Sequence, residues 1–208
     1  MWFPILITVL VGYLLGNLNG AVLMSNLMAH EDVRSQGSGN AGLTNFARNY
    51  GGIGSVAVLA IDGVKAALAC LAGGLMLAPY DMYLQGLAIG GLAVMLGHDF
   101  PALLGFKGGK GILSGAVIAF VIDWRIGLLI LGVFVLLYLV TQYVSLGSVM
   151  AAVFFGVGFV IFHRDDLLVM SCGVVMAALA VFMHRGNIAR LIRGQERKTN
   201  LFKKGSKK

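Results

Sequence analysis

The chain has 208 residues, of which 58% are hydrophobic and only 12% are charged, and its formal net charge is +7. Soluble domains carry about 45–50% apolar and about 25% charged residues, so this chain has too little charge to cover a soluble globule. The composition also excludes a disordered chain, a collagen and a coiled coil, because it lacks the charge, repeats or heptads that these require. It predicts an integral membrane protein.

Apolar segments follow one another along the chain, at 5–26, 53–79, 83–97, 112–122, 126–140, 149–162 and 167–183. A helix needs about 20 residues to cross the bilayer core. The first two segments meet that length, whereas the fourth meets it only if residues 108–111 join the helix. The runs are continuous and do not alternate with period two, which excludes a membrane β-barrel. We predict an all-α, polytopic integral membrane protein with seven transmembrane helices, or five as the alternative, in a single domain over 1–208.

Lysine and arginine are divided unequally between the two sides of this arrangement. With the N-terminus outside, thirteen of them fall inside and two outside, and nine of the thirteen lie in residues 184–208. Positive charge concentrates on the cytoplasmic side of membrane proteins. We therefore predict that the N-terminus is outside and that 184–208 includes a basic cytoplasmic C-terminal tail. A basic end directly after a span indicates topology and lipid contact and no nucleic-acid partner.

This orientation gathers the polar segments 30–50, 98–111, 141–148 and 184–208 on the cytoplasmic side. Irregular polar backbone is tolerated at a membrane only where it is buried in protein or lines a water-filled cavity. We expect these segments to form a site.

The first polar segment reads GSGNAGLTNFAR over 37–48. The segment contains GxGxxG, but we do not expect it to bind a dinucleotide, because a membrane span precedes it where that motif requires a strand. Its glycines let backbone amides approach an anion, and Ser38, Thr44 and Asn45 add neutral donors. Arg48 can hold a phosphate through a bidentate fork. The alternative is a surface loop that uses glycine only for its turns.

The second polar segment places Lys107 and Lys110 around two glycines, which predicts a compact cationic cradle. It is not a P-loop, because glycine follows Lys110 where that motif has Ser or Thr. His98 is either a base near neutral pH or a hydrogen-bonded structural group. Inside the second span, Asp62 and Lys65 are expected to pair, since intramembrane charges are costly. Whether this pair belongs to the site is left open.

The last polar segment begins HRGNIARL at 184. His184, Asn187 and the apolar residues at 188 and 191 share one helical face. We expect Arg185 and Arg190 to lie on other faces, in contact with lipid phosphates.

Together these segments closely resemble the PlsY family of bacterial acyl-phosphate:glycerol-3-phosphate acyltransferases. The matching motifs are GSGNxGxTNxxR at 37–48, GHxxPxxxxFKGGKG at 97–111, YVSLxS at 143–148, HRxNIxRLxxGxE at 184–196 and DxxK at 62–65. The chain departs from the commoner family residues at Leu43, Ala66 and Gly147, none of which carries a polar side chain.

The resemblance implies transfer of a fatty acyl group from acyl phosphate to the 1-hydroxyl of glycerol 3-phosphate. The products are lysophosphatidate and phosphate, and this is the first acylation step of phospholipid biosynthesis. It also implies a bacterial cytoplasmic (inner) membrane location with the site facing the cytoplasm, membrane lipids as partners, and a functional link to a soluble enzyme that makes acyl phosphate. We expect no cofactor and no metal.

The resemblance assigns two sets of site residues by motif. The catalytic set is Ser38, Lys110, His184 and Asn187. The substrate-binding set is Gly37, Gly39, Asn40, Thr44, Asn45, Arg48, His98, Lys107, Gly108, Gly109 and Ser145. The acceptor's hydroxyl proton could pass to His98, to His184 or to the donor phosphate.

Two other functional classes are less well supported. The chain has no HxxxxD motif, which counts against the common acyl-CoA-dependent glycerolipid acyltransferases. A transporter of phosphorylated solutes would also explain seven spans and cationic loops. Transport sites, however, usually lie near the bilayer midplane between inverted repeats, whereas these motifs cluster on one side and no repeat is visible.

Overall fold

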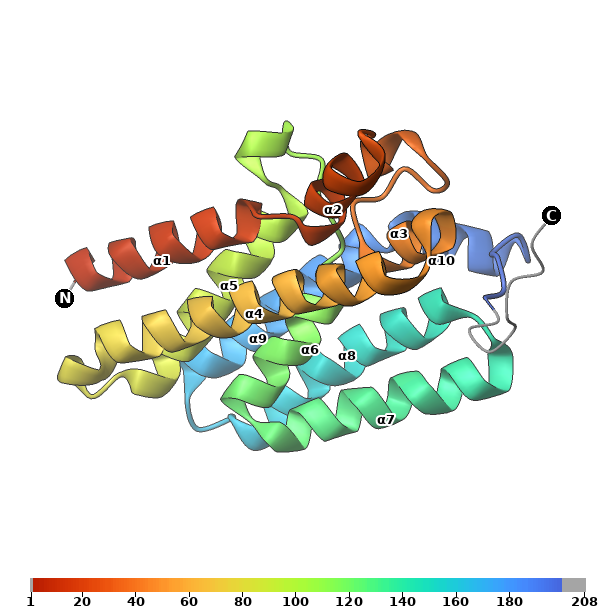
Figure 1. Cartoon of the computed structure of the whole chain (residues 1–208). Coiled ribbons are helices and arrows are strands. Elements are labelled where there is room, and N and C mark those ends of the chain that lie inside the picture. The colour runs from red at the N-terminus through yellow and green to blue at the C-terminus, as the bar shows by residue number, and fades with distance from the viewer. Residues whose placement is uncertain (1, 200–208) are drawn as a thin grey trace.

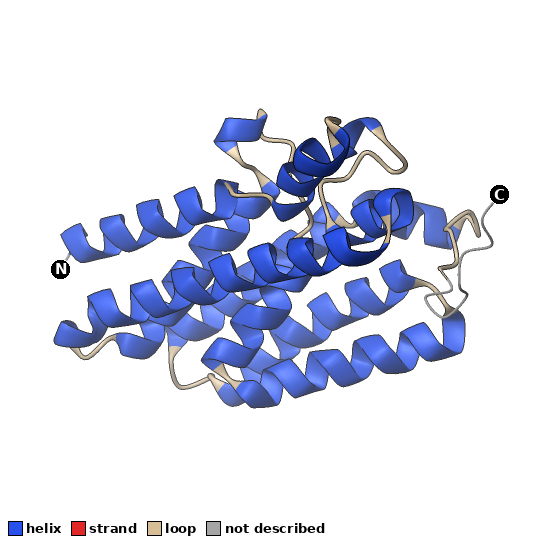
Figure 2. Ribbon diagram, in the orientation of Figure 1, coloured by secondary structure: helices blue, strands red, loops and turns tan. Residues whose placement is uncertain are grey.

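The computed structural model describes residues 2–199, and all regular structure in that range is helical (Figures 1 and 2). The longer helices are α1 (Trp2–Asn17), α4 (Gly52–Leu77), α5 (Tyr83–Asp99), α6 (Ile112–Ile122), α7 (Trp124–Thr141), α8 (Val144–Phe162) and α9 (Leu167–Met183). The shorter ones are α2 (Gly20–Ala29), α3 (Leu43–Tyr50) and α10 (Arg185–Ile192), with 3-10 turns at Val33–Ser35, Ala78–Tyr80 and Ala102–Leu104.

The described residues contain 5 helical segments that are long and apolar enough to cross a membrane: Trp2–Ala29, Gly52–Tyr80, Tyr83–Leu104, Trp124–Thr141 and Val144–Phe162. The pair α9 and α10 passes the same test together, although it is bent by 55°. Helix α6 is apolar but shorter. The chain therefore has the architecture of a multi-pass membrane protein.

The first span contains a break that its apolar sequence does not reveal. Helix α1 ends at Asn17 and α2 begins at Gly20. Asn19 caps α2, because its Oδ1 accepts a hydrogen bond from the backbone N–H of Val22 at 3.0 Å. Such caps satisfy amide groups that the helix itself leaves unpaired.

Helices α1, α4 and α5 pack closely because glycines lie where they cross. A Cβ atom on Gly86 of α5 would lie 2.2 Å from the carbonyl oxygen of Gly73 on α4. A Cβ atom on Gly97 would lie 2.2 Å from the carbonyl oxygen of Tyr13 on α1. Small residues at helix crossings are typical of membrane bundles, where close backbone approach drives association.

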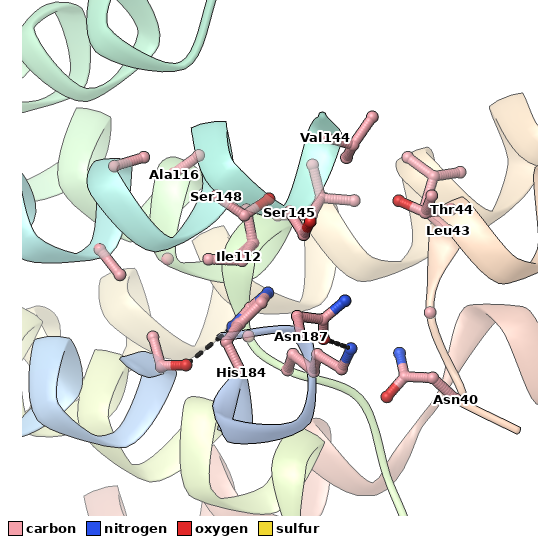
Figure 3. Close-up of a pocket in the computed structure, with 18 of the residues that line it drawn as sticks. Asn40, Leu43, Thr44, Ile112, Ala116, Val144, Ser145, Ser148, His184 and Asn187 are labelled. Carbon is pink, nitrogen blue, oxygen red and sulfur yellow. Dashed lines mark hydrogen bonds between the residues drawn. The ribbon is translucent and has the colours of Figure 1, made fainter. Parts of the chain in front are cut away.

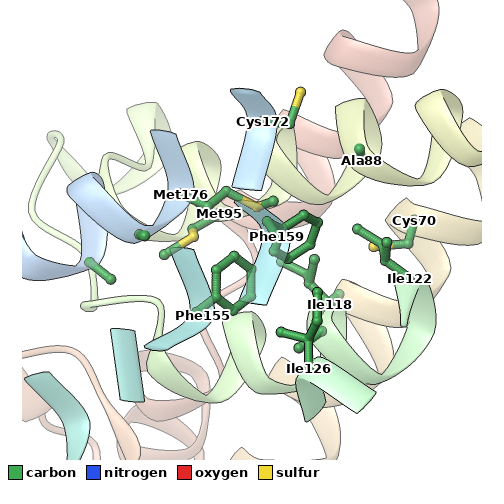
Figure 4. Close-up of a cluster of buried hydrophobic side chains, with 14 of the residues drawn as sticks. Cys70, Ala88, Met95, Ile118, Ile122, Ile126, Phe155, Phe159, Cys172 and Met176 are labelled. Atoms are coloured by element: carbon green, nitrogen blue, oxygen red, sulfur yellow. The ribbon is translucent and has the colours of Figure 1, made fainter. Parts of the chain in front are cut away.

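The main hydrophobic core joins this layer to α6, α8 and α9. Phe155 and Phe159 of α8 pack beside Met176 of α9, Met95 of α5 and Ile118 of α6 (Figure 4). The core fixes how these helices stand relative to one another. Helices α2, α3 and α10 gather at the same end of the bundle, opposite the N-terminal end of α1 (Figure 1).

Candidate active site

The glycine-rich segment 37–42 folds around the side chain of Asn45. Gly37 and Gly39 adopt positive φ angles of 60° and 70°, a region that glycine enters without strain. Oδ1 of Asn45 accepts a hydrogen bond from the backbone N–H of Ser38 at 2.9 Å, and Nδ2 donates to the carbonyls of Val33 and Gln36, each at 3.0 Å. The amide that the sequence predicted as a phosphate donor is therefore engaged in shaping the loop.

The second loop, 105–111, lies against the end of α5. The N–H of Gly109 donates to the carbonyl of His98 at 3.0 Å, and the N–H of Gly108 donates to the carbonyl of Asp99 at 3.2 Å. A Cβ atom on Gly108 would lie 2.0 Å from the His98 carbonyl oxygen, so this approach requires glycine. The loop brings Lys110 into the site.

His184 and Asn187 flank the bend between α9 and α10. Nδ1 of His184 lies 2.8 Å from the carbonyl oxygen of Ala180. Since a carbonyl can only accept, Nδ1 carries the hydrogen of the neutral ring and Nε2 is the nitrogen that can take up a proton. Lys110 donates from Nζ to Oδ1 of the buried Asn187, which ties α10 to the second loop (Figure 3).

Arg190 and Glu196, which the sequence did not assign to the site, also belong to it. Arg190 lines the cavity, whereas we expected it to contact lipid phosphates. Its Nε donates to Oε2 of Glu196 at 2.6 Å, and Oε1 of Glu196 accepts from Nδ2 of Asn187 at 2.9 Å. Their places in the last motif, three and nine residues after Asn187, were the available signal.

Burial and charge set the protonation of these groups. Burial, with a smaller contribution from the neighbouring Arg190, lowers the pKa of Lys110 to about 8. Burial raises the pKa of Glu196, but hydrogen bonds from Asn187 and Arg190 outweigh it, so the pKa lies below its usual value. Burial also lowers the pKa of Arg48, which donates to Oγ1 of Thr199. A guanidinium stays charged at neutral pH in spite of such a shift.

These groups line one end of a cavity of about 690 Å³. Ser145 and Ser148 of α8 face His184 and Asn187 across it, with Asn40 and Thr44 alongside (Figure 3). The rest of the wall is mainly apolar and comes mostly from α6, α7, α8 and α9, including Ile112, Ala116, Ile130, Phe134, Ala151, Phe155 and Met176. Leu59 and Asp62 of α4 and Met95 of α5 also line it. A smaller and mainly polar cavity of about 320 Å³ adjoins the first and shares Ser38, Asn40, Lys110, Asn187 and Arg190 with it.

The structure brings together most of the residues that the motifs predicted. Lining the larger cavity are Gly37, Ser38, Asn40, Thr44, Asn45, Arg48, His98, Lys110, Ser145, His184 and Asn187. Gly39 lines the smaller one. Lys107, Gly108 and Gly109 line neither cavity, and Lys107 is exposed. The two glycines shape the loop through hydrogen bonds from their backbone N–H groups to the end of α5. Residues 200–208 of the basic tail lie outside the described range.

Within residues 2–199, the structure contains no group of three or more His, Cys, Asp or Glu side chains that could hold a metal ion.

The structure is thus a membrane-spanning helical bundle whose cavity is cationic at one end and mainly apolar along the rest. Residues 6–194 match the family model of glycerol-3-phosphate acyltransferases, and the chain belongs to this family.

Curated relatives and solved structures agree with this assignment. A glycerol-3-phosphate acyltransferase of Thermoanaerobacter sp. (strain X514) is 37% identical over 92% of this chain and 94% of its own length. That of Clostridioides difficile (strain 630) is 35% identical over 94% of this chain and 96% of its own. The crystal structure of PlsY, an integral membrane glycerol 3-phosphate acyltransferase, in its glycerol 3-phosphate form superposes with a TM-score of 0.83 at 31% identity, covering 96% of this chain and 99% of PlsY.

Proposed function

We propose that this acyltransferase moves a fatty acyl group from acyl phosphate to the 1-hydroxyl of glycerol 3-phosphate in phospholipid synthesis, giving lysophosphatidate and phosphate. Family membership and the named relatives support acyl transfer to glycerol 3-phosphate. Structures of PlsY in a glycerol 3-phosphate form and a lysophosphatidic acid form are consistent with this acceptor and product. The observation that carries the proposal is the cavity, which joins a cationic end to an apolar wall and so fits a phosphate joined to an acyl chain.

The two adjoining cavities suggest how both substrates reach one reacting centre. The acyl chain lies along the apolar wall of the larger cavity, and the wholly polar acceptor enters through the smaller one. Ser38, Lys110 and Asn187 border both cavities, so the reacting groups meet beside them. Holding two reactants in this way can supply about 7–11 kcal/mol of the barrier.

The reaction proceeds by direct attack of the acceptor hydroxyl on the acyl carbon. A carbon–oxygen bond forms to O1 of glycerol 3-phosphate, the bond from the acyl carbon to the phosphate oxygen breaks, and phosphate leaves. Nε2 of His184 takes the hydroxyl proton, since Nδ1 is engaged with Ala180. Asn187 and Lys110 polarise the reacting carbonyl. Preorganised donors of this kind usually make the largest contribution to catalysis.

The phosphoryl groups are held by the two glycine-rich loops and by helix α3, which follows the first loop. Ser38, Thr44, Arg48 and Lys110 contact them, with Ser145 as a further donor from α8. Asn45 and the glycines of both loops shape the backbone that carries these donors. Arg190 and Glu196 complete the charged end of the cavity.

We further propose seven crossings, with the site on the cytoplasmic side of a bacterial cell membrane. The 5 long segments, the bent pair α9–α10 and the short helix α6 would make up the seven. The distribution of lysine and arginine supports an outside N-terminus. A soluble enzyme that makes acyl phosphate would then supply the donor.

The experiment that tests this function uses the purified protein in detergent. Phosphate release that requires both acyl phosphate and glycerol 3-phosphate, with lysophosphatidate as product, supports it. Acyl-CoA offered in place of acyl phosphate should give no transfer. Uptake of glycerol 3-phosphate into liposomes without turnover would instead identify a transporter.

A further inference from the structure

A buried ion pair lies inside the membrane-spanning helix α4. Asp62 and Lys65 are 2% and 3% exposed, and Oδ1 of Asp62 lies 2.8 Å from Nζ of Lys65. Replacing such a pair by apolar side chains of similar volume often leaves stability unchanged or raises it. Intramembrane charges are therefore a reason to look for a function.

The pair holds the two ends of the break in the first span. Nζ of Lys65 donates to the carbonyls of Gly16, at 3.2 Å, and of Leu18. The last carbonyls of a helix have no partner within it, so Lys65 caps α1. Oδ1 of Asp62 accepts from the N–H of Gly20 at 3.1 Å, where α2 begins.

The break in turn contacts the first loop, the glycine-rich segment 37–42. Asn19, which lies between α1 and α2, donates from Nδ2 to the carbonyl of Ala41 at 3.0 Å. Its Oδ1 is the cap of α2, so the side chain is fixed at both ends. Ala41 is completely buried and belongs to the glycine-rich segment that carries Ser38.

The same pair contacts His98, which packs against the second loop, 105–111. Nδ1 of His98 lies 3.0 Å from Nζ of Lys65. An ammonium group can only donate, so Nδ1 accepts and Nε2 carries the ring hydrogen. The Nε2 edge packs on the second loop, where a Cβ atom on Gly109 would lie 2.0 Å from it.

We infer that Asp62, Lys65 and His98 are positioning residues that set the spacing between the loops 37–42 and 105–111. The pair fixes the first loop through Asn19 and the second through His98. Ser38 stands on one loop and Lys110 on the other, so their separation depends on this network. A misplacement of about 1 Å in a catalytic arrangement can reduce the rate about 100-fold. The role in catalysis rests on the proposed function, whereas the effect on the loops does not.

The test replaces both charges together, in the double variant Asp62→Leu with Lys65→Met, so that no unpaired charge is left in the membrane. We expect its thermal unfolding temperature to stay close to that of the unmodified protein. The KM for glycerol 3-phosphate should rise at least about tenfold, and the factor by which KM rises should exceed the factor by which kcat falls. Amide hydrogen exchange should become faster in residues 37–42 and 105–111.

Gln85→Met is the matched control. It lies on α5 like His98 but at the other end, where Nε2 of Gln85 donates to Oδ2 of Asp166 at 2.7 Å. This change also removes one polar contact between two helices. It should leave the KM values and the exchange of both loops unchanged.

His98→Asn tests the contact with the second loop separately from the contact with the first loop, and it leaves the ion pair in place. Asparagine keeps an acceptor for Lys65 but cannot reach Gly109. Exchange should therefore rise in 105–111 and stay unchanged in 37–42.

The inference is overturned if a folded double variant shows unchanged hydrogen exchange and unchanged KM. If the double variant does not fold, the same result in His98→Asn overturns it. If the unmodified protein transfers no acyl group, the proposed function fails, and the exchange measurement still decides whether the network positions the loops.

Discussion

Lys110 is the residue at the cationic end whose charge changes nearest to neutral pH. Its pKa lies at about 8, lowered by burial and by Arg190. Below that pH the ammonium is charged and, in the proposed mechanism, binds phosphate, and above that pH the charge is lost. We expect kcat/KM for glycerol 3-phosphate to fall as the pH rises through about 8. A profile measured from about pH 6 to pH 10 checks this.

Lys110→Arg gives the matched profile, because a guanidinium keeps its charge over the whole range. Its overall activity should be lower, but the fall on the alkaline side should disappear. If both proteins decline at the same pH, another group is responsible for the decline.

In the proposed site, Arg48 would bind phosphate through geometry as well as charge. Its guanidinium lines the cavity and donates a hydrogen bond to the hydroxyl of Thr199. Arg48→Lys keeps the charge and loses the fork, and hydrogen bonds to charged groups contribute about 1.5–3 kcal/mol each. We expect kcat/KM to fall about 10- to 100-fold, mostly through KM. Steady-state kinetics with each substrate varied in turn would measure this, and unchanged KM values for both would remove Arg48 from the phosphate site.

Ser38 distinguishes a covalent from a direct mechanism. Its backbone N–H is held by Asn45 and its chain neighbours are glycines, so no base is adjacent in the sequence. With direct attack, Ser38→Ala should lose about 10²–10³-fold in kcat, as expected when one donor to developing charge is removed. Double-reciprocal plots of the unmodified protein should intersect. An ester-linked acyl group recovered on Ser38 after quenching would show that the serine is a nucleophile.

At the scale of the helices, the apolar runs of the sequence predicted the bounds of some helices closely but did not predict every helix end. The runs 112–122 and 167–183 coincide with α6 and α9, because an uninterrupted apolar run in lipid has no alternative to a helix. The run 5–26 lies within one span, Trp2–Ala29, as predicted, but the helix in that span is interrupted at Leu18 and Asn19. Tertiary contacts from Lys65 and Asp62 stabilise that break, and a local pattern does not contain them.

Most of the residues that the motifs predicted for the site line the two cavities, but the motifs do not specify how their side chains are oriented. Lys110 and Asn187 line the cavity, whereas Lys107 is exposed and lines neither cavity, and Asn45 is engaged with the backbone. Arg190 lies in the cavity because the bend after α9 turns α10 toward it. Side-chain direction depends on such packing, which spacing along the chain does not specify.

The crossing of α4 and α5 predicts a specific instability. Gly86→Leu would push a side chain into the backbone of Gly73, and overpacking of a tight interior typically costs about 1–3 kcal/mol. Gly132→Leu on α7 is the control, since a Cβ atom there meets no atom within 4 Å. Thermal unfolding in detergent should show a lower midpoint for Gly86→Leu alone. Equal midpoints for the two variants would contradict the close crossing.

The orientation of the whole molecule can be tested with its own cysteines as a silent background. Cys70 and Cys172 are both free and buried, so a membrane-impermeant thiol reagent should not reach them. Trp2 and Ile192 are 87% and 82% exposed. Trp2 begins α1 and Ile192 ends α10, and the N-terminal end of α1 lies opposite α10 in the bundle (Figure 1). In intact cells, Trp2→Cys should be labelled from outside, and Ile192→Cys only after the membrane is permeabilised. The reverse pattern would invert the proposed topology.

The union of a cationic end and an apolar wall in one cavity has a practical consequence for purification. Single-chain detergents with a phosphate headgroup present the same two chemical features as the proposed acyl donor. Such a detergent should occupy the 690 Å³ cavity and compete with the substrate, whereas an alkyl maltoside lacks the phosphate. Preparations extracted with phosphate-headed detergents should therefore look inactive until the detergent is exchanged, although the protein in them is folded.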